Sequence, residues 1–107
     1  MIKEKAKEVV EYYDILPQLK YLQSEVFELS EAIICAEQFK KFNDRYTIFD
    51  KGHIAEEIAD VMFFLIQFMQ YYEIDDERIE KVLNYKADRQ LGRINNEKAT
   101  KKQEKGE

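Results

Sequence analysis

The sequence predicts an all-α fold in which four helices form one domain. Apolar residues recur every three or four positions over several long segments, which is the spacing of amphipathic helices. Only three glycines and one proline interrupt the 107 residues, which is too few for a turn-rich β architecture. A chain of this length favours one domain with one modest core. We therefore expect residues 1–94 to form a single all-α domain.

The first predicted helix covers residues 2–13, where a thin apolar stripe recurs at helical spacing. A second helix is predicted over residues 17–39, and Pro17 suits its first turn because a proline there loses no intrahelical hydrogen bond. The apolar face of this second helix comprises Leu19, Leu22, Val26, Leu29, Ile33 and Ala36.

Residues 40–52 are expected to form a loop, because they contain the pairs Asn-Asp and Lys-Gly, which are turn signals. The third predicted helix, over residues 53–72, is the most hydrophobic segment, and apolar side chains cover more than half of its circumference. Such a helix must be buried on several sides. In a chain this small, we expect a second subunit to cover part of it; a well-wrapped monomer is the alternative.

The fourth predicted helix begins after Asp75, whose side chain suits an N-cap. Ile79, Val82 and Leu83 form its inner face, and it is expected to end near Ile94. Residues 95–107 are polar and lack an apolar face, so we expect this tail to be disordered.

The charge and cysteine content exclude several classes of protein. A net charge of −5 argues against binding to a nucleic-acid polymer, which requires cationic side chains at the phosphates. A nucleotide enzyme stays open, because metal ions can hold phosphates in an acidic pocket. The single cysteine, Cys35, rules out an intramolecular disulfide framework, which favours a reducing, cytoplasmic location. No signal peptide is expected, and the longest apolar run, residues 61–69, is too short to enter a membrane as a spanning helix.

Two carboxylate pairs stand out on the second and third predicted helices. Glu25 and Glu28 are three residues apart, as are Glu57 and Asp60. With about 100° of rotation per residue, Glu25 and Glu57 fall within the apolar arcs and the other two at their edges. Buried carboxylates are costly, and four that converge cannot all stay ionised without compensation.

A divalent cation would resolve this repulsion. Hard oxygen ligands suit Mg²⁺, with Mn²⁺ as a substitute, whereas the absence of His and Cys at these positions disfavours zinc. The alternative is that the pairs are solvated, since a carboxylate pair at this spacing is common on any charged helix. Two such pairs, both facing inward on successive helices, favour the metal site.

Residues 24–29 (SEVFEL) and 56–61 (EEIADV) resemble the paired signature of the MazG-like all-α nucleoside triphosphate pyrophosphohydrolases, which is Glu-x-x-Glu on one helix and Glu-x-x-Asp on the next. Residues 84–89 (NYKADR) resemble the Asn-x-Lys-x-x-Arg of the family's last helix. The resemblance covers about residues 18–93.

This resemblance implies a four-helix core that assembles as a homodimer or homotetramer. It implies magnesium-dependent hydrolysis of a nucleoside or deoxynucleoside triphosphate to the monophosphate and pyrophosphate. The catalytic metal ligands that carry over are Glu25, Glu28, Glu57 and Asp60, and the phosphate contacts are Asn84, Lys86 and Arg89. One position departs from the family, because Ser24 stands where many members have a further Glu; Glu56 is a candidate substitute.

Two other functions are alternatives to this one. A non-catalytic helical module would use the third helix for oligomerisation and show no metal dependence. A di-metal bundle for redox chemistry normally uses Glu-x-x-His pairs, and neither inward pair ends in His. His53, the only histidine, is expected to serve at the start of the third helix, and Cys35 is expected to pack.

Overall fold

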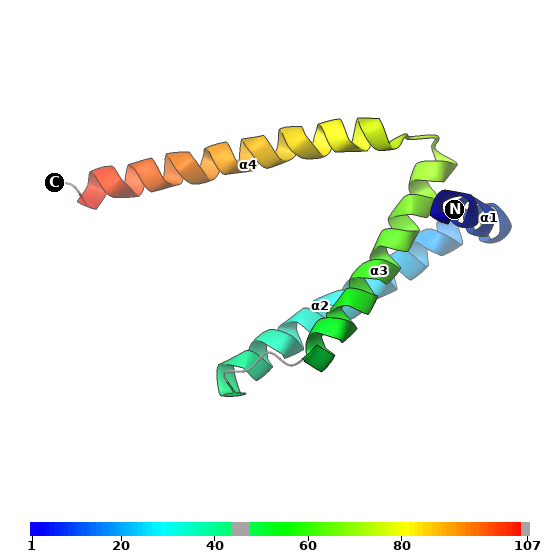
Figure 1. The fold of residues 1–107 in the computed structure, drawn as a ribbon, viewed down its shortest axis with the longest axis horizontal. Coiled ribbons are helices and arrows are strands. Elements are labelled where there is room, and N and C mark those ends of the chain that lie inside the picture. The colour runs from blue at the N-terminus through cyan, green and yellow to red at the C-terminus, as the bar shows by residue number, and fades with distance from the viewer. Residues whose placement is uncertain (44–47, 106–107) are drawn as a thin grey trace. The chain divides into compact units, whose positions relative to one another are not determined.

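The computed structural model is all-α, with four helices and no strand within the part of the chain that it describes, residues 1–43 and 48–105 (Figure 1). Side chains are described within residues 1–38 and 51–104. The helices are α1 (Ile2–Tyr13), α2 (Ile15–Asn43), α3 (Ile48–Tyr71) and α4 (Asp76–Lys105). None of them, over the described residues, combines the length and apolar character needed to cross a bilayer. The predicted fold class, all-α with four helices, is confirmed.

The chain divides into two units, Met1–Glu73 and Ile74–Glu107, which we describe separately. In the first unit α1 packs on α3 and α2 through Ala6 and Val10, which are fully buried. At Asp14, where α1 ends, the backbone turns with a φ of 74° and a ψ of 160°, a region that residues other than glycine rarely adopt. Its Oδ1 accepts a hydrogen bond from the backbone N–H of Ile15 at 2.8 Å, and α2 begins there.

Helices α2 and α3 run antiparallel, side by side (Figure 1). We call their facing residues the α2–α3 seam; these residues are buried or half-buried and recur at alternating intervals of three and four, as in a coiled coil. On α2 they are Ile15, Gln18, Leu22, Glu25, Leu29, Ala32 and Ala36. On α3 they are Ile54, Glu57, Val61, Phe64 and Phe68, with Gln67 beside them. The predicted inward placement of Glu25 and Glu57 thus agrees with the observed burial.

The two buried polar residues of the described chain, Gln18 and Gln67, contact each other in this interface. Nε2 of Gln18 donates a hydrogen bond to Oε1 of Gln67 at 2.8 Å. Nε2 of Gln67 is buried and has no hydrogen-bond partner within the side chains that the structure describes. An unsatisfied buried donor of this kind costs about 1–3 kcal/mol.

The loop predicted over residues 40–52 is wrong at both ends, because α2 continues to Asn43 and α3 begins at Ile48. The Lys-Gly pair at Gly52 lies within α3, where a glycine costs a helix only about 1 kcal/mol. The rest of the predicted loop, residues 44–47, lies outside the described residues. Pro17 does lie in the first turn of α2, as predicted.

The second unit consists mainly of α4. Oδ1 of Asp75 accepts a hydrogen bond from the backbone N–H of Arg78 at 2.8 Å, so the predicted N-cap is confirmed. The helix continues to Lys105, past Ile94, and most of the tail that we expected to be disordered is helical. Lys and Glu make up six of the eleven residues from 95 to 105, and both have a high intrinsic helix propensity.

Candidate metal centre

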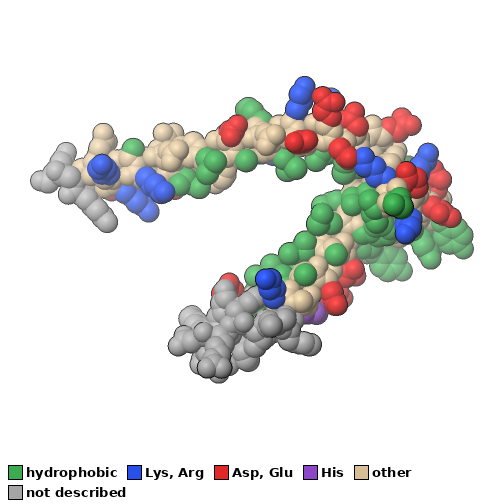
Figure 2. Space-filling model, viewed as in Figure 1, with side chains coloured by type: hydrophobic (Ala, Val, Ile, Leu, Met, Phe, Trp, Pro, Cys, Tyr) green, Lys and Arg blue, Asp and Glu red, His purple; other side chains and the backbone are tan. Residues whose placement is uncertain are grey.

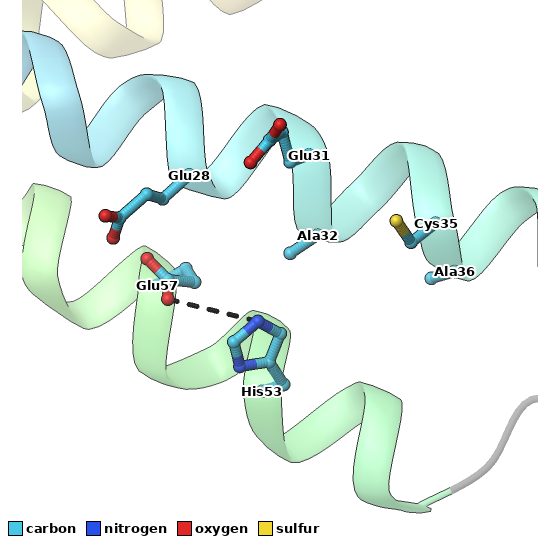
Figure 3. Close-up of a pocket in the computed structure, with 7 residues that line it drawn as sticks. All are labelled: Glu28, Glu31, Ala32, Cys35, Ala36, His53 and Glu57. Atoms are coloured by element: carbon cyan, nitrogen blue, oxygen red, sulfur yellow. Dashed lines mark ion pairs between the residues drawn. The ribbon is translucent and has the colours of Figure 1, made fainter.

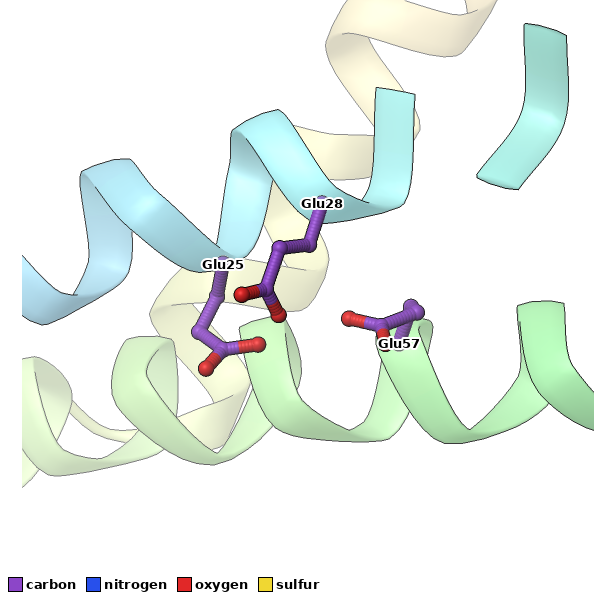
Figure 4. Close-up of side chains that lie close together, drawn as sticks. All are labelled: Glu25, Glu28 and Glu57. Carbon is purple, nitrogen blue, oxygen red and sulfur yellow. The ribbon is translucent and has the colours of Figure 1, made fainter. Parts of the chain in front are cut away.

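Three carboxylates converge between α2 and α3. One oxygen from each of Glu25, Glu28 and Glu57 lies within 4.8 Å of the other two (Figure 4). Glu25 and Glu28 come from successive turns of α2, where a spacing of three residues places side chains on one face. Glu57 reaches the same point from α3. The seam therefore joins side chains that are about 30 residues apart in the sequence.

The three carboxylates of this cluster differ in how deeply they are buried. The Glu57 side chain is 12% exposed, and Glu25 is half-buried, whereas Glu28 is exposed. Oε2 of Glu25 and Oε2 of Glu57 are both buried and have no hydrogen-bond partner among the described residues. A buried carboxylate oxygen that lacks a partner is unfavourable, and a bound cation is one way to satisfy it.

The electrostatics of the cluster favour a proton or a cation at Glu25. Burial raises the pKa of Glu25, and the negative charges of Glu28 and Asp60, a hydrogen bond to Glu28 and the charge of Glu57 raise it further. A divalent cation among the same oxygens would reverse this effect, because it favours the ionised form of each ligand.

Asp60, the fourth predicted ligand, lies near the cluster but outside its closest group. It is exposed, one turn of α3 beyond Glu57, and its charge reaches Glu25. No oxygen of Asp60 belongs to the group within 4.8 Å. The structure thus brings three of the four predicted ligands together and places the fourth at the border. All four are oxygen donors, the set that hard cations such as Mg²⁺ and Mn²⁺ prefer.

His53 lies beside the cluster, which the sequence analysis did not anticipate. It is one turn before Glu57 on α3, with its Nε2 4.0 Å from Oε1 of Glu57, and its side chain is 51% exposed (Figure 3). The signal in the sequence was the i, i+4 spacing of His53 and Glu57. This spacing is informative only because α3 begins at Ile48, which puts His53 inside the helix and not at its start.

A cavity of about 450 Å³ adjoins the cluster between α2 and α3 (Figure 3). Its lining residues are Glu28, Glu31, Ala32, Cys35, Ala36, His53 and Glu57. Glu28 and Glu57 belong to both the cavity and the cluster, so a ligand in the cavity would lie next to a bound cation. Cys35, expected to pack, is exposed on the cavity wall.

The predicted phosphate contacts lie on α4, in the second unit, and all three are exposed. Lys86 and Arg89 are three residues apart and share a face of the helix. Asn84 is two residues before Lys86, which at about 100° per residue places it on a different face. Helix α4 therefore brings together the two cations but not the amide. Ser24 and Glu56, the position that departs from the family and its candidate substitute, are exposed on α2 and α3.

Comparison of the chain with models of known protein families, with curated proteins and with solved structures finds no match.

Proposed function

We propose that this chain is a magnesium-dependent nucleoside triphosphate pyrophosphohydrolase of the MazG type, which converts a nucleoside or deoxynucleoside triphosphate to the monophosphate and pyrophosphate. The observation that supports this most is the convergence of Glu25, Glu28 and Glu57, each of which has one oxygen within 4.8 Å of the other two. Oε2 of Glu25 and Oε2 of Glu57 are also buried, with no hydrogen-bond partner among the described residues. The adjoining cavity offers space for the substrate next to the cluster.

In this proposal the protein holds the cation with carboxylates from both helices. Glu25, Glu28 and Glu57 are the ligands, and Asp60 completes the set from the border of the cluster. A magnesium ion supplies charge neutralisation for the triphosphate and activation of the attacking water. Among the carboxylates of the cluster, Glu28 is exposed and borders the cavity, so we propose that it accepts the proton of that water.

The triphosphate also needs cationic partners. Lys86 and Arg89 share one face of α4 and can bind neighbouring phosphate oxygens together, Arg through bidentate geometry. Asn84 is retained as a phosphate contact only on the strength of the family resemblance, since it occupies another face of the helix.

We propose further that the enzyme is a homodimer or homotetramer. On α2, Leu19, Val26 and Ile33 are exposed and recur every seven residues. On α3, Ile58 and Leu65 show the same spacing, with Met62 between them, and all three are 42–53% exposed. Figure 2 shows hydrophobic side chains along this helix pair. A row of large apolar side chains on one face favours cover by a second copy.

The test is pyrophosphate release from a panel of ribonucleoside and deoxynucleoside triphosphates, with and without Mg²⁺ or Mn²⁺. Wild type, Glu28→Gln and the control Glu8→Gln are compared; Glu8 is exposed on α1, away from the carboxylate cluster. Cation-dependent release by wild type and by Glu8→Gln, with loss of at least 100-fold in Glu28→Gln, would support the proposal. Folded protein that releases pyrophosphate from no nucleotide would contradict it.

The exposed apolar faces also favour a second candidate, a non-catalytic oligomerisation module. That protein would bind no magnesium. The substitution Glu25→Gln would remove a buried carboxylate from it and would be neutral or stabilising for the fold. Loss of magnesium-dependent activity in the same variant separates the two functions.

A further inference from the structure

The contact between Gln18 and Gln67 has a defined relation to the carboxylate cluster. Gln18 lies seven residues before Glu25 on α2, and Gln67 lies seven residues after Asp60 on α3. Seven residues are about two helical turns and return a side chain to nearly the same face. We call the alignment of α2 and α3 along their common axis their stagger. Because the two helices are antiparallel, the stagger that brings the two glutamines into contact also brings Glu25 close to the carboxylates of α3.

Most other contacts along the seam cannot fix this stagger. Leu22, Leu29, Val61, Phe64 and Phe68 are apolar, and apolar contacts are non-directional. The hydrogen bond between the glutamines is directional and forms only when their amides meet, at 2.8 Å in this structure. A buried polar pair within an apolar helix interface is a recognised means of setting register.

The carboxylate cluster itself opposes the observed stagger when no cation is bound. Glu25, Glu28 and Glu57 each place one carboxylate oxygen within 4.8 Å of the other two, and like charges at this separation repel one another. A shift of α3 along α2 would separate these carboxylates and relieve their repulsion. The glutamine pair is the contact that such a slip would break.

We propose that the Gln18–Gln67 amide pair is a positioning element, which holds the stagger of α2 and α3 and so keeps Glu57 opposite Glu25 and Glu28 before a cation binds. Its effect on magnesium affinity rests on the proposed function, whereas its effect on stagger does not. Nε2 of Gln67 is buried with no hydrogen-bond partner among the described residues, so two apolar side chains at these positions would stabilise the fold more than the glutamines do. A role in positioning therefore explains the glutamine pair better than a role in stability.

The test replaces both glutamines by methionine, which keeps the length and flexibility of the side chains but removes the hydrogen bond. Spin labels at Ser30 on α2 and Glu56 on α3, both exposed, report the stagger by pulsed dipolar spectroscopy in a Cys35→Ser background. Labelled protein is diluted with unlabelled protein, so that only distances within one chain are read. The control is Leu22→Met, a seam substitution that introduces methionine without removing an amide.

We expect the double variant Gln18→Met/Gln67→Met to melt no lower than wild type, yet to show a second or broadened distance. A slip of one heptad moves the labels about 10 Å along the helix axis. Leu22→Met should keep the single wild-type distance. In unlabelled protein, Mg²⁺ affinity measured by isothermal titration calorimetry should fall at least tenfold in the double variant and stay unchanged in the control.

A single wild-type distance in the folded double variant would overturn the inference. If methionine prevents folding, Gln18→Leu/Gln67→Leu is measured in the same way, and an unchanged distance there has the same meaning. If wild type binds no Mg²⁺ but the double variant shows the shifted distance, the proposed function is contradicted and the positioning role is supported. Wild type that binds Mg²⁺, with an unchanged distance in the double variant, would do the reverse.

Discussion

The two oxygens of the Glu57 carboxylate have different surroundings: Oε1 lies 4.0 Å from Nε2 of His53, and Oε2 is buried with no hydrogen-bond partner in the described part of the chain. His53 precedes Glu57 by one turn of α3, so the imidazole and the carboxylate stand on the same face of the helix. The imidazole is therefore placed to orient Glu57 from its solvent side, while the orphaned oxygen lies within the carboxylate cluster.

We predict that His53→Ala weakens magnesium binding without abolishing it. A group that orients a metal ligand typically contributes about 10- to 100-fold in affinity, and the long, half-exposed contact places His53 near the lower value. His53→Gln, which retains a hydrogen-bond donor, should recover part of the loss. Isothermal titration with Mg²⁺ measures both variants, and affinities equal to that of wild type would show that the imidazole plays no part.

The raised pKa of Glu25 predicts how the stability of the metal-free protein changes with pH. Because burial and the neighbouring carboxylates raise its pKa above the ordinary value of 4.5, the folded state holds this proton more tightly than the unfolded state does. The contribution of Glu25 to stability is therefore fully present below pH 4.5 and is lost as the pH rises through the raised pKa.

Thermal melts in chelator across this pH range check the sign. Wild type should lose stability as the pH rises, relative to Glu25→Gln, and Glu25→Gln should melt higher than wild type at neutral pH by roughly a few degrees. Saturating Mg²⁺ should reduce the difference between the two. Parallel curves for wild type and variant would show that Glu25 titrates as an ordinary surface carboxylate.

Magnesium should stabilise the folded protein through the carboxylate cluster. A ligand at 100 times its Kd adds about 2.7 kcal/mol to the free energy of unfolding when it binds only the folded state. The melting temperature of wild type should therefore rise with Mg²⁺ concentration, whereas that of Glu57→Gln should not. Glu8→Gln, exposed on α1, serves as the control and should respond as wild type does. An equal response in Glu57→Gln would place the cation elsewhere.

The exposed face of α3 should form a subunit interface. Met62 is 53% exposed in the middle of that face, and a charge there would have to be buried by the second copy. Light scattering coupled to size-exclusion chromatography should find wild type as a dimer or tetramer and Met62→Glu as a smaller species. Gln38→Glu, an exposed polar position on another face of α2, should keep the wild-type mass. A monomeric wild type would refute the interface.

Periodicity was sufficient to predict the helices and the inward side of the carboxylates. Glu25 and Glu57 occupy seam positions because the apolar spacing around them places them there, and that spacing can be read from a single helix. Helix ends were less predictable: turn propensity at Gly52 is weak, and α3 extends through it to Ile48. The early start of α3 is also what brings His53 into the helix and next to Glu57.

The Gln18–Gln67 pair lies beyond prediction from periodicity. Each glutamine alone reads as a polar residue near an apolar face, and only the stagger of α2 against α3 shows that the two amides meet. The convergence of Glu28 with Glu57 depends on the same stagger, so the sequence could indicate which carboxylates face inward but not which of them touch.

The central claim is that the chain cleaves a triphosphate between its α and β phosphates with magnesium at the carboxylate cluster. Phosphorus NMR of a consumed nucleoside triphosphate, in Mg²⁺ and with Glu57→Gln beside wild type, tests it most directly because it identifies the bond that breaks. We predict that wild type yields monophosphate and pyrophosphate and that Glu57→Gln yields neither. Diphosphate with inorganic phosphate, or equal product from both proteins, would contradict the account.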